Sequence, residues 1–210
     1  MIMLDELVTQ LEADVPAENG TPSEAQYQRA VKDAVADFGR RAGRIKRTAL
    51  NIVSGTASYV LPMDFIKMVN LVGLFGQDGI LNTPQGLIPL EAAYAEEYLV
   101  NGGVITFYPT PQYTMAREYR YKAGWALTEE SGGDYYDDLT EDEAAIALML
   151  ARANATRHKA DALGGGFSYR QGDVAVDTTG QAADLRGTVE KLTADYQAAV
   201  ERYVGTVLVM

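Results

Sequence analysis

The sequence predicts an α+β fold, mainly α, in which a bundle of long helices carries an inserted small antiparallel β-rich lobe. Helical periodicity marks the two ends of the chain, and shorter strand-like runs with turn residues mark the middle. We therefore expect residues 1–47 and 128–205 to form the helical core and residues 48–127 to form the β-rich lobe. Residues 206–210 are expected to be an apolar C-terminal tail.

The N-terminal helices are indicated by apolar stripes. Residues 3–13 place Leu4, Leu7, Val8 and Leu11 on one face. The segment TPSE, residues 21–24, then offers Thr21 as N-cap, Pro22 at the first helical position and Glu24 to close a capping box. We expect this second helix to run to about Arg47, with a buried stripe of Tyr27, Val31, Ala34, Phe38 and Ile45.

The middle of the chain reads as short strands and turns. LNIVSGTASYVLP, residues 50–62, indicates a strand, a Ser–Gly turn and a second strand. VITFYP, residues 104–109, is a further strand, and REYRYKAGW, residues 117–125, alternates charged and aromatic side chains as a half-buried antiparallel strand does. A single helical turn is expected at residues 62–64 and a short helix at residues 90–99.

Two more helices are expected after the lobe. TEDE, residues 140–143, forms a capping box, and Gly164 to Gly166 end the helix that it starts. Its predicted apolar stripe is Ile146, Met149, Leu150 and Ala153. The last helix has a seam of Leu185, Val189, Leu192, Tyr196, Val200 and Tyr203. Gly205 is expected to act as a hinge before the tail TVLVM, which either folds back or adds to a neighbouring protein.

Composition removes several classes of function. The chain has 210 residues, no cysteine and one histidine, His158, so disulfides, cysteine nucleophiles and His-rich metal sites are excluded. A net charge of −11 argues against a protein that grips nucleic acid along a basic surface. The N-terminus lacks a basic stretch, and the longest apolar run, residues 144–151, is too short for a membrane helix, so we expect a cytoplasmic site of synthesis.

The candidate catalytic motifs lack the partners that they need. VAVDTTGQ, residues 174–181, has the spelling of a nucleotide-sensing or protease segment, but no Gly-x4-Gly-Lys-Ser/Thr loop accompanies it, and its flanks are helical. We interpret Asp177 to Gly180 as a turn. The acidic stretch Glu129 to Glu143 does not match the spacing of a Ca²⁺ loop. It is interpreted as a solvated loop, although a metal-dependent enzyme that uses it or Asp177 stays open as an alternative.

The five basic residues between Arg40 and Arg47 have two interpretations of equal weight. They complement the dipole at a helix C-terminus, or they form a docking patch for an acidic partner surface: Arg40, Arg41, Arg44, Lys46 and Arg47.

The order of the elements and three short motifs resemble the head-to-tail connector (adaptor) proteins of tailed double-stranded DNA phages. The motifs are Tyr-x-Leu-Pro-x-Asp-Phe at residues 59–65, Phe-Tyr-Pro-x-Pro at residues 107–111 and the segment FSYRQGDVAVDTTG at residues 167–180. The resemblance spans about residues 21–203, and the sizeable lobe at residues 48–127 departs from the smaller connectors.

The resemblance implies a structural role without catalysis, cofactor or metal. Such proteins form a homo-oligomeric ring, usually dodecameric, below the portal protein; the ring extends the DNA ejection channel and carries the attachment site for tail or stopper proteins. DNA would pass without specific binding, and the protein would be made in the cytoplasm of a bacterial host and end in the virion neck, without contact with a membrane. A stopper or tail-completion neck protein is the alternative within this class. The expected portal or subunit contacts are Arg40, Arg41, Arg44, Arg47, Tyr169, Asp173, Val207, Leu208 and Val209.

Overall fold

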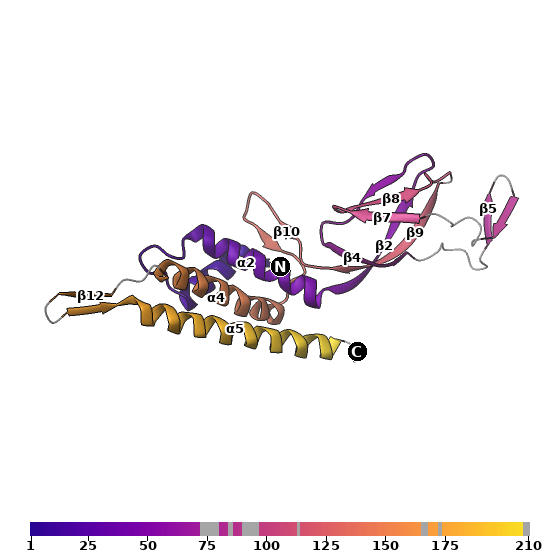
Figure 1. The fold of residues 1–210 in the computed structure, drawn as a ribbon. Helices are drawn as coiled ribbons and strands as arrows, with labels where there is room; N and C mark the ends of the chain where they lie inside the picture. The colour runs from indigo at the N-terminus through magenta and orange to yellow at the C-terminus, as the bar shows by residue number, and fades with distance from the viewer. Residues whose placement is uncertain are drawn as a thin grey trace. The chain divides into compact units, whose positions relative to one another are not determined.

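The computed structural model shows a mixed α+β chain that divides into two compact units, and so confirms the predicted α+β class (Figure 1). One unit, here called the helical unit, comprises residues 1–42 and 125–210; the other, here called the lobe, comprises residues 43–124. The structure describes residues 1–71, 80–83, 86–89, 97–112, 114–164, 168–171 and 174–207.

Four helices of the described chain share one apolar core in the helical unit: α1 (Leu4–Asp14), α2 (Glu24–Ala42), α4 (Glu141–Leu163) and α5 (Thr178–Val207). Helix α4 packs along both α2 and α5 (Figure 1). The expected face of α1 is buried, and every residue of the predicted α5 seam is buried or half-buried. These two amphipathic patterns are therefore confirmed.

Helix α4 buries alanines where larger side chains were expected. Ala153 is buried as predicted, but Ile146, Met149 and Leu150 are only partly buried. The alanine side chain ends at Cβ, so the backbones of α2 and α5 can approach α4 closely on two sides. The fully buried positions of α4 are mainly Ala144, Ala147, Leu148, Ala151, Ala155 and Ala160.

Helix capping agrees with the sequence at α4 and differs at α2. The Thr140 hydroxyl accepts a hydrogen bond from the Glu143 amide (3.4 Å), and the Glu143 carboxylate accepts one from the Thr140 amide (2.9 Å). At α2 the predicted cap is two residues too early. The helix begins at Glu24, and the amide of Ser23 donates to the side chain of Gln26 (2.7 Å), so Ser23 takes the place expected for Thr21.

Short antiparallel strands complete the helical unit. Strands β1 (Ile2–Met3), β11 (Tyr135–Tyr136) and β10 (Leu127–Thr128) form one small sheet in that order. Strands β12 (Ser168–Gln171) and β13 (Val174–Asp177) form a hairpin, and α5 starts directly after it. The turn predicted at residues 177–180 is therefore wrong, because Thr178 already belongs to the helix.

The lobe contains two three-stranded antiparallel sheets that share an apolar core. The first has the order β2 (Arg44–Ile52), β9 (Met115–Ala123), β4 (Phe65–Leu71). The second has the order β3 (Ser58–Val60), β8 (Val104–Tyr108), β7 (Glu97–Asn101). Strands β5 (Ile80–Thr83) and β6 (Gly86–Pro89) form a separate hairpin. The strands expected in residues 50–62, 104–109 and 117–125 are confirmed.

A two-residue turn joins β7 to β8. Asn101 pairs with Val104, and both intervening residues, Gly102 (φ 56°) and Gly103 (φ 76°), have a positive φ. Two consecutive residues with positive φ are typical of the tight hairpin turn whose twist matches the right-handed twist of the flanking strands. Glycine adopts a positive φ without strain because it has no Cβ.

Four other expectations of secondary structure are wrong. Helix α2 ends at Ala42 rather than Arg47, because residues 44–52 pair along their whole length with β9. Residues 97–99 belong to β7 rather than to a helix, and residues 90–96 lie outside the described chain. The amide of Phe65 closes a turn on the Pro62 carbonyl (3.0 Å) without a helix. Helix α5 continues through Gly205 to Val207, so Gly205 is not a hinge.

Candidate interaction surfaces

The basic cluster expected at one helix end is divided between two elements. Arg40 and Arg41 lie in the last turn of α2, whereas Arg44 and Arg47 lie in strand β2, which belongs to the lobe. A continuous patch on one helix was therefore a wrong expectation, since the backbone changes from helix to strand at Gly43.

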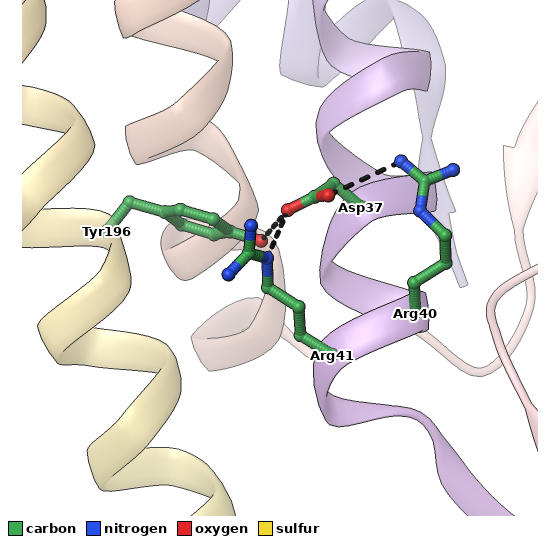
Figure 2. A network of polar contacts seen from close by, with 4 residues as sticks. All are labelled: Asp37, Arg40, Arg41 and Tyr196. Atoms are coloured by element: carbon green, nitrogen blue, oxygen red, sulfur yellow. Dashed lines mark hydrogen bonds and ion pairs between the residues drawn. The ribbon is translucent and has the colours of Figure 1, made fainter.

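Asp37 organises the end of α2. Its Oδ2 atom accepts hydrogen bonds from Arg41 Nε (2.7 Å) and from the Tyr196 hydroxyl (2.9 Å), and its Oδ1 atom accepts one from Arg40 (3.3 Å), as Figure 2 shows. The Arg41 guanidinium also lies over the Tyr196 ring, 5.9 Å from its centre. One carboxylate thus joins two arginines of α2 to a buried tyrosine of α5.

The charge state of this cluster follows from its contacts. Partial burial opposes ionisation of Asp37, but the hydrogen bonds from Arg41 and Tyr196 and the charge of Arg41 outweigh it, so the pKa of Asp37 is lowered. Burial, together with the hydrogen bond to Asp37, raises the pKa of Tyr196. The carboxylate therefore stays ionised and the tyrosine stays neutral near pH 7. The side chain of Arg40 remains 63% exposed and that of Arg41 49% exposed, so both present positive charge to solvent.

A second cluster of polar side chains around a carboxylate, that of Asp64, connects strands of the lobe. Lys46 Nζ lies 2.9 Å from Asp64 Oδ2, and the Tyr121 hydroxyl donates to Asp64 Oδ1 (3.0 Å). Burial and the adjacent Asp64 raise the pKa of Tyr121 to about 12. Because Asp64 precedes β4 while Lys46 and Tyr121 lie in β2 and β9, this cluster fixes the edges of the first sheet against each other.

Two of the three motifs that carry the family resemblance, residues 59–65 and 107–111, lie in the lobe and have structural roles there. The Tyr59 hydroxyl accepts a hydrogen bond from the Val53 amide (2.8 Å) and donates to the Thr56 carbonyl (2.9 Å), which holds the turn before β3. Phe65 stacks on Tyr121 with 5.7 Å between ring centres. Phe107 and Pro111 are fully buried, and the Pro111 carbonyl accepts from the Gly55 amide (2.8 Å). These residues position the strands of the lobe by contacts within the lobe itself.

Two of the other predicted contact residues belong to the described part of the chain. Tyr169 is in β12, opposite Val176 of β13, and Val207 is the last residue of α5. Asp173, Leu208 and Val209 lie outside the described residues.

Two residues of the acidic stretch, residues 129–143, make contacts within the helical unit. Glu143 is buried and accepts a hydrogen bond from the Tyr203 hydroxyl (2.5 Å), and Asp134 pairs with Lys32 (3.6 Å). Across the described ranges, no three His, Cys, Asp or Glu side chains gather as a metal ion would require. His158 is half-buried on α4.

The helical unit has two small hollows among its described residues. A hollow of about 390 Å³ lies beside α1 and the start of α4, and Glu6 and Glu141 are among the residues that line it. A smaller one of about 220 Å³ lies beside Lys159, which is held by the Pro16 carbonyl (3.1 Å) and by Glu18 (3.4 Å). No helix in the described part of the chain combines the length and the apolarity needed to cross a bilayer.

Sequence comparison gives one match. A family model described as SU10 adaptor protein matches residues 3–203 and thus spans the helical unit and the lobe. No curated protein matches the chain.

Proposed function

The chain belongs to the SU10 adaptor protein family, a family of phage head-to-tail adaptors, and from this membership we propose that its copies form a ring below the portal of a tailed phage. The resemblance seen in the motifs is thereby confirmed at the level of the family. The proposal adds that the ring, usually dodecameric in such proteins, extends the DNA ejection channel and provides the attachment site for tail or stopper proteins in the virion neck. In this proposal the helical unit is a bundle of long helices, and the lobe and residues 206–210 also contact partners.

Electrostatics supports a channel that DNA crosses without being held. Each copy carries a net charge of −11, so a ring multiplies a strongly negative field. A negatively charged channel wall repels the phosphates of DNA. It also offers few Lys and Arg side chains that could replace the counterions of DNA, and this replacement is what makes DNA binding favourable. A structural adaptor needs this behaviour, because DNA has to slide past it during ejection.

The portal contacts are proposed in three stretches of the helical unit. Arg40 and Arg41 are more than half and about half exposed while Asp37 holds their guanidinium groups in a defined orientation. A pre-oriented pair of cations suits an acidic surface on the portal, since less side-chain freedom is lost on binding. Tyr169 of β12 and Val207 of α5, together with Asp173, Leu208 and Val209 outside the described residues, complete the proposed contacts.

Electron microscopy of the purified protein mixed with its portal tests this function. A ring bound to the portal supports an adaptor, whereas binding only at the tail-facing end of a portal–adaptor complex identifies a stopper or tail-completion protein. Failure to join any ring with portal or neck proteins refutes the proposal.

A charge reversal tests the portal contact separately. Arg40→Glu is expected to weaken portal binding by about tenfold, the loss typical of one unfavourable charge at a contact. Arg29→Glu is the matched control, because Arg29 lies on the same helix and is 80% exposed. Equal portal binding by the two variants contradicts the assignment of Arg40.

A further inference from the structure

The two units of the chain differ sharply in charge. The lobe contains seven Lys and Arg residues and six Asp and Glu residues, so its net charge is +1 and the helical unit carries the remaining −12. All seven cations of the lobe lie in the three strands of its first sheet: Arg44, Lys46 and Arg47 in β2, Lys67 in β4, and Arg117, Arg120 and Lys122 in β9.

Strand alternation places four of these cations on the outer face of that sheet. Tyr119 and Tyr121 of β9 point into the lobe core, so the intervening Arg120 and Lys122 point outward. Arg120 is directly opposite Arg47, and Lys122 is directly opposite Lys67.

This arrangement brings cations of neighbouring strands opposite one another. Like charges directly opposite on neighbouring strands repel each other. Glu118 offsets part of the repulsion through its ion pair with Arg47 (3.4 Å), yet the Arg47 side chain remains 59% exposed. A sheet that retains two like-charged cross-strand pairs on one face is well suited to an anionic partner. We call this face, formed by Arg47, Lys67, Arg120 and Lys122, the basic face.

Apolar side chains are mixed with these cations. Ile45, opposite Lys122, is 58% exposed, and Val69 of β4 is 52% exposed. Exposed isoleucine and valine gain little from a phosphate backbone but are readily buried by a protein surface. The composition of the basic face therefore favours an acidic protein segment over DNA.

The chain itself contains such a segment. Residues 123–151 include eight acids and no Lys or Arg. Six of these carboxylate side chains are exposed, in a stretch that also exposes Ser131 and Gly132: Glu129, Glu130, Asp137, Asp138, Glu141 and Asp142. We call residues 129–142 the acidic segment.

We propose that the basic face of one copy binds the acidic segment of the adjacent copy and so forms the subunit interface of the ring. This inference rests on the proposed ring. A ring joins two different surfaces of each copy, and complementary charges fix both the order and the register of such a contact. The interface would also neutralise part of the repulsion within the basic face and within the acidic segment.

Two charge-reversed variants and their mixture test the interface. Arg47→Glu with Lys67→Glu lowers the net charge of the four basic-face residues from +4 to 0, and Glu129→Lys with Asp137→Lys reduces that of the acidic segment from −7 to −3. Each variant alone then places its introduced charges opposite like charges of the adjacent copy, and its ring yield on the portal is expected to fall about tenfold or more. In a mixture with alternating copies, one contact is that of the wild type, and in the other the introduced glutamates face the introduced lysines, so ring yield is expected to recover.

Matched controls separate the interface from net charge. Arg29→Glu with Lys191→Glu removes the same charge from exposed positions of α2 and α5, and Glu12→Lys with Glu24→Lys adds it on α1 and α2. Both controls are expected to assemble as wild type does. Circular dichroism checks that every variant is folded, and mass photometry counts the subunits in each ring.

The outcomes distinguish the interface from the function. Absence of rings with the wild-type protein refutes the proposed function itself. Wild-type rings together with unimpaired rings of either reversed variant overturn the interface. Folded variants that fail alone and also fail in the mixture overturn it as well, since the two surfaces then do not meet. A basic-face variant that keeps its rings but loses binding to a duplex DNA probe would assign that face to DNA instead.

Discussion

Removal of one hydroxyl group tests how helix α5 is held on the helical unit. In Tyr196→Phe the buried ring is retained, because Tyr196 is only 1% exposed and phenylalanine fills the same space. The variant loses the 2.9 Å hydrogen bond from the Tyr196 hydroxyl to Asp37 Oδ2, while the ring keeps its packing. The change therefore isolates a single contact between α5 and α2.

The magnitude follows from what Asp37 keeps. A hydrogen bond to a charged group contributes about 1.5–3 kcal/mol when the partner is left unsatisfied. Here Arg41 still donates to the same oxygen at 2.7 Å, and the Asp37 side chain is 22% exposed to water. We therefore expect the free energy of unfolding to fall by about 1–2 kcal/mol, around or below the lower limit of that range.

The single tryptophan gives a local readout. Trp125 stacks on Phe38 with 4.8 Å between ring centres, inside the helical unit, so its fluorescence in a urea titration reports the unfolding of that unit. A double-mutant cycle of Tyr196→Phe with Asp37→Asn is expected to show a coupling energy of about 1 kcal/mol. A coupling within about 0.3 kcal/mol of zero, the error of additive sites, would refute this account of the contact.

The pH dependence provides a second check on Asp37. Its native pKa is lowered, so the ionised carboxylate stabilises the fold above the unfolded-state pKa of about 4, and this stability is lost as the pH falls through the native value. The difference in unfolding free energy between wild type and Asp37→Asn should stay constant from about pH 7 to pH 5 and shrink below about pH 4. A difference that grows in acid would contradict the sign of the shift.

Three further predictions concern other parts of the fold. Thr140→Ala removes the side-chain acceptor of the α4 capping box and should cost about 1 kcal/mol in the urea titration, whereas an unchanged midpoint would show that the box contributes nothing. Ala151→Leu forces a larger side chain into a fully buried position between helices and should cost about 1–3 kcal/mol, with Ala145→Leu at an exposed position of α4 as the neutral control. Tyr121 should ionise only near pH 12, so stability from its neutral form is present below about pH 10 and lost as the pH rises toward 12; the absorbance of tyrosinate in wild type and Tyr121→Phe measures this, and ionisation near pH 10 would disprove the burial argument.

The sequence predicted correctly those helices and strands whose pattern of apolar, polar and capping residues is visible within a short segment. The apolar spacing of α1 and α5, the capping box at Thr140 and the alternation in β9 each depend on residues close together in the sequence. The same signals placed the end of α2 at Arg47, since residues 40–47 continue an acceptable helical pattern. Whether that segment is helix or strand depends on β9, about 70 residues away, which provides the ladder that β2 completes.

The candidate surfaces show the same division. Composition alone indicated an acidic protein with a basic cluster and an acidic stretch, and three motifs indicated the family. The sequence did not reveal that Arg40 and Arg41 share Asp37 with Tyr196, because their partner lies about 160 residues away on α5. It also did not reveal the basic face, because Arg47, Lys67 and Arg120 come from three strands that only the sheet brings together.

The sequence by itself determined the α+β class, the periodicity of most helices and the membership of an adaptor family, because these properties reside in local patterns of residue type. The tertiary structure decided where α2 stops, which alanines form the centre of the helical unit and which charges share a surface. Those properties depend on pairing between distant segments, where the free energy of a strand ladder or of a packed interface exceeds the small preferences of single residues.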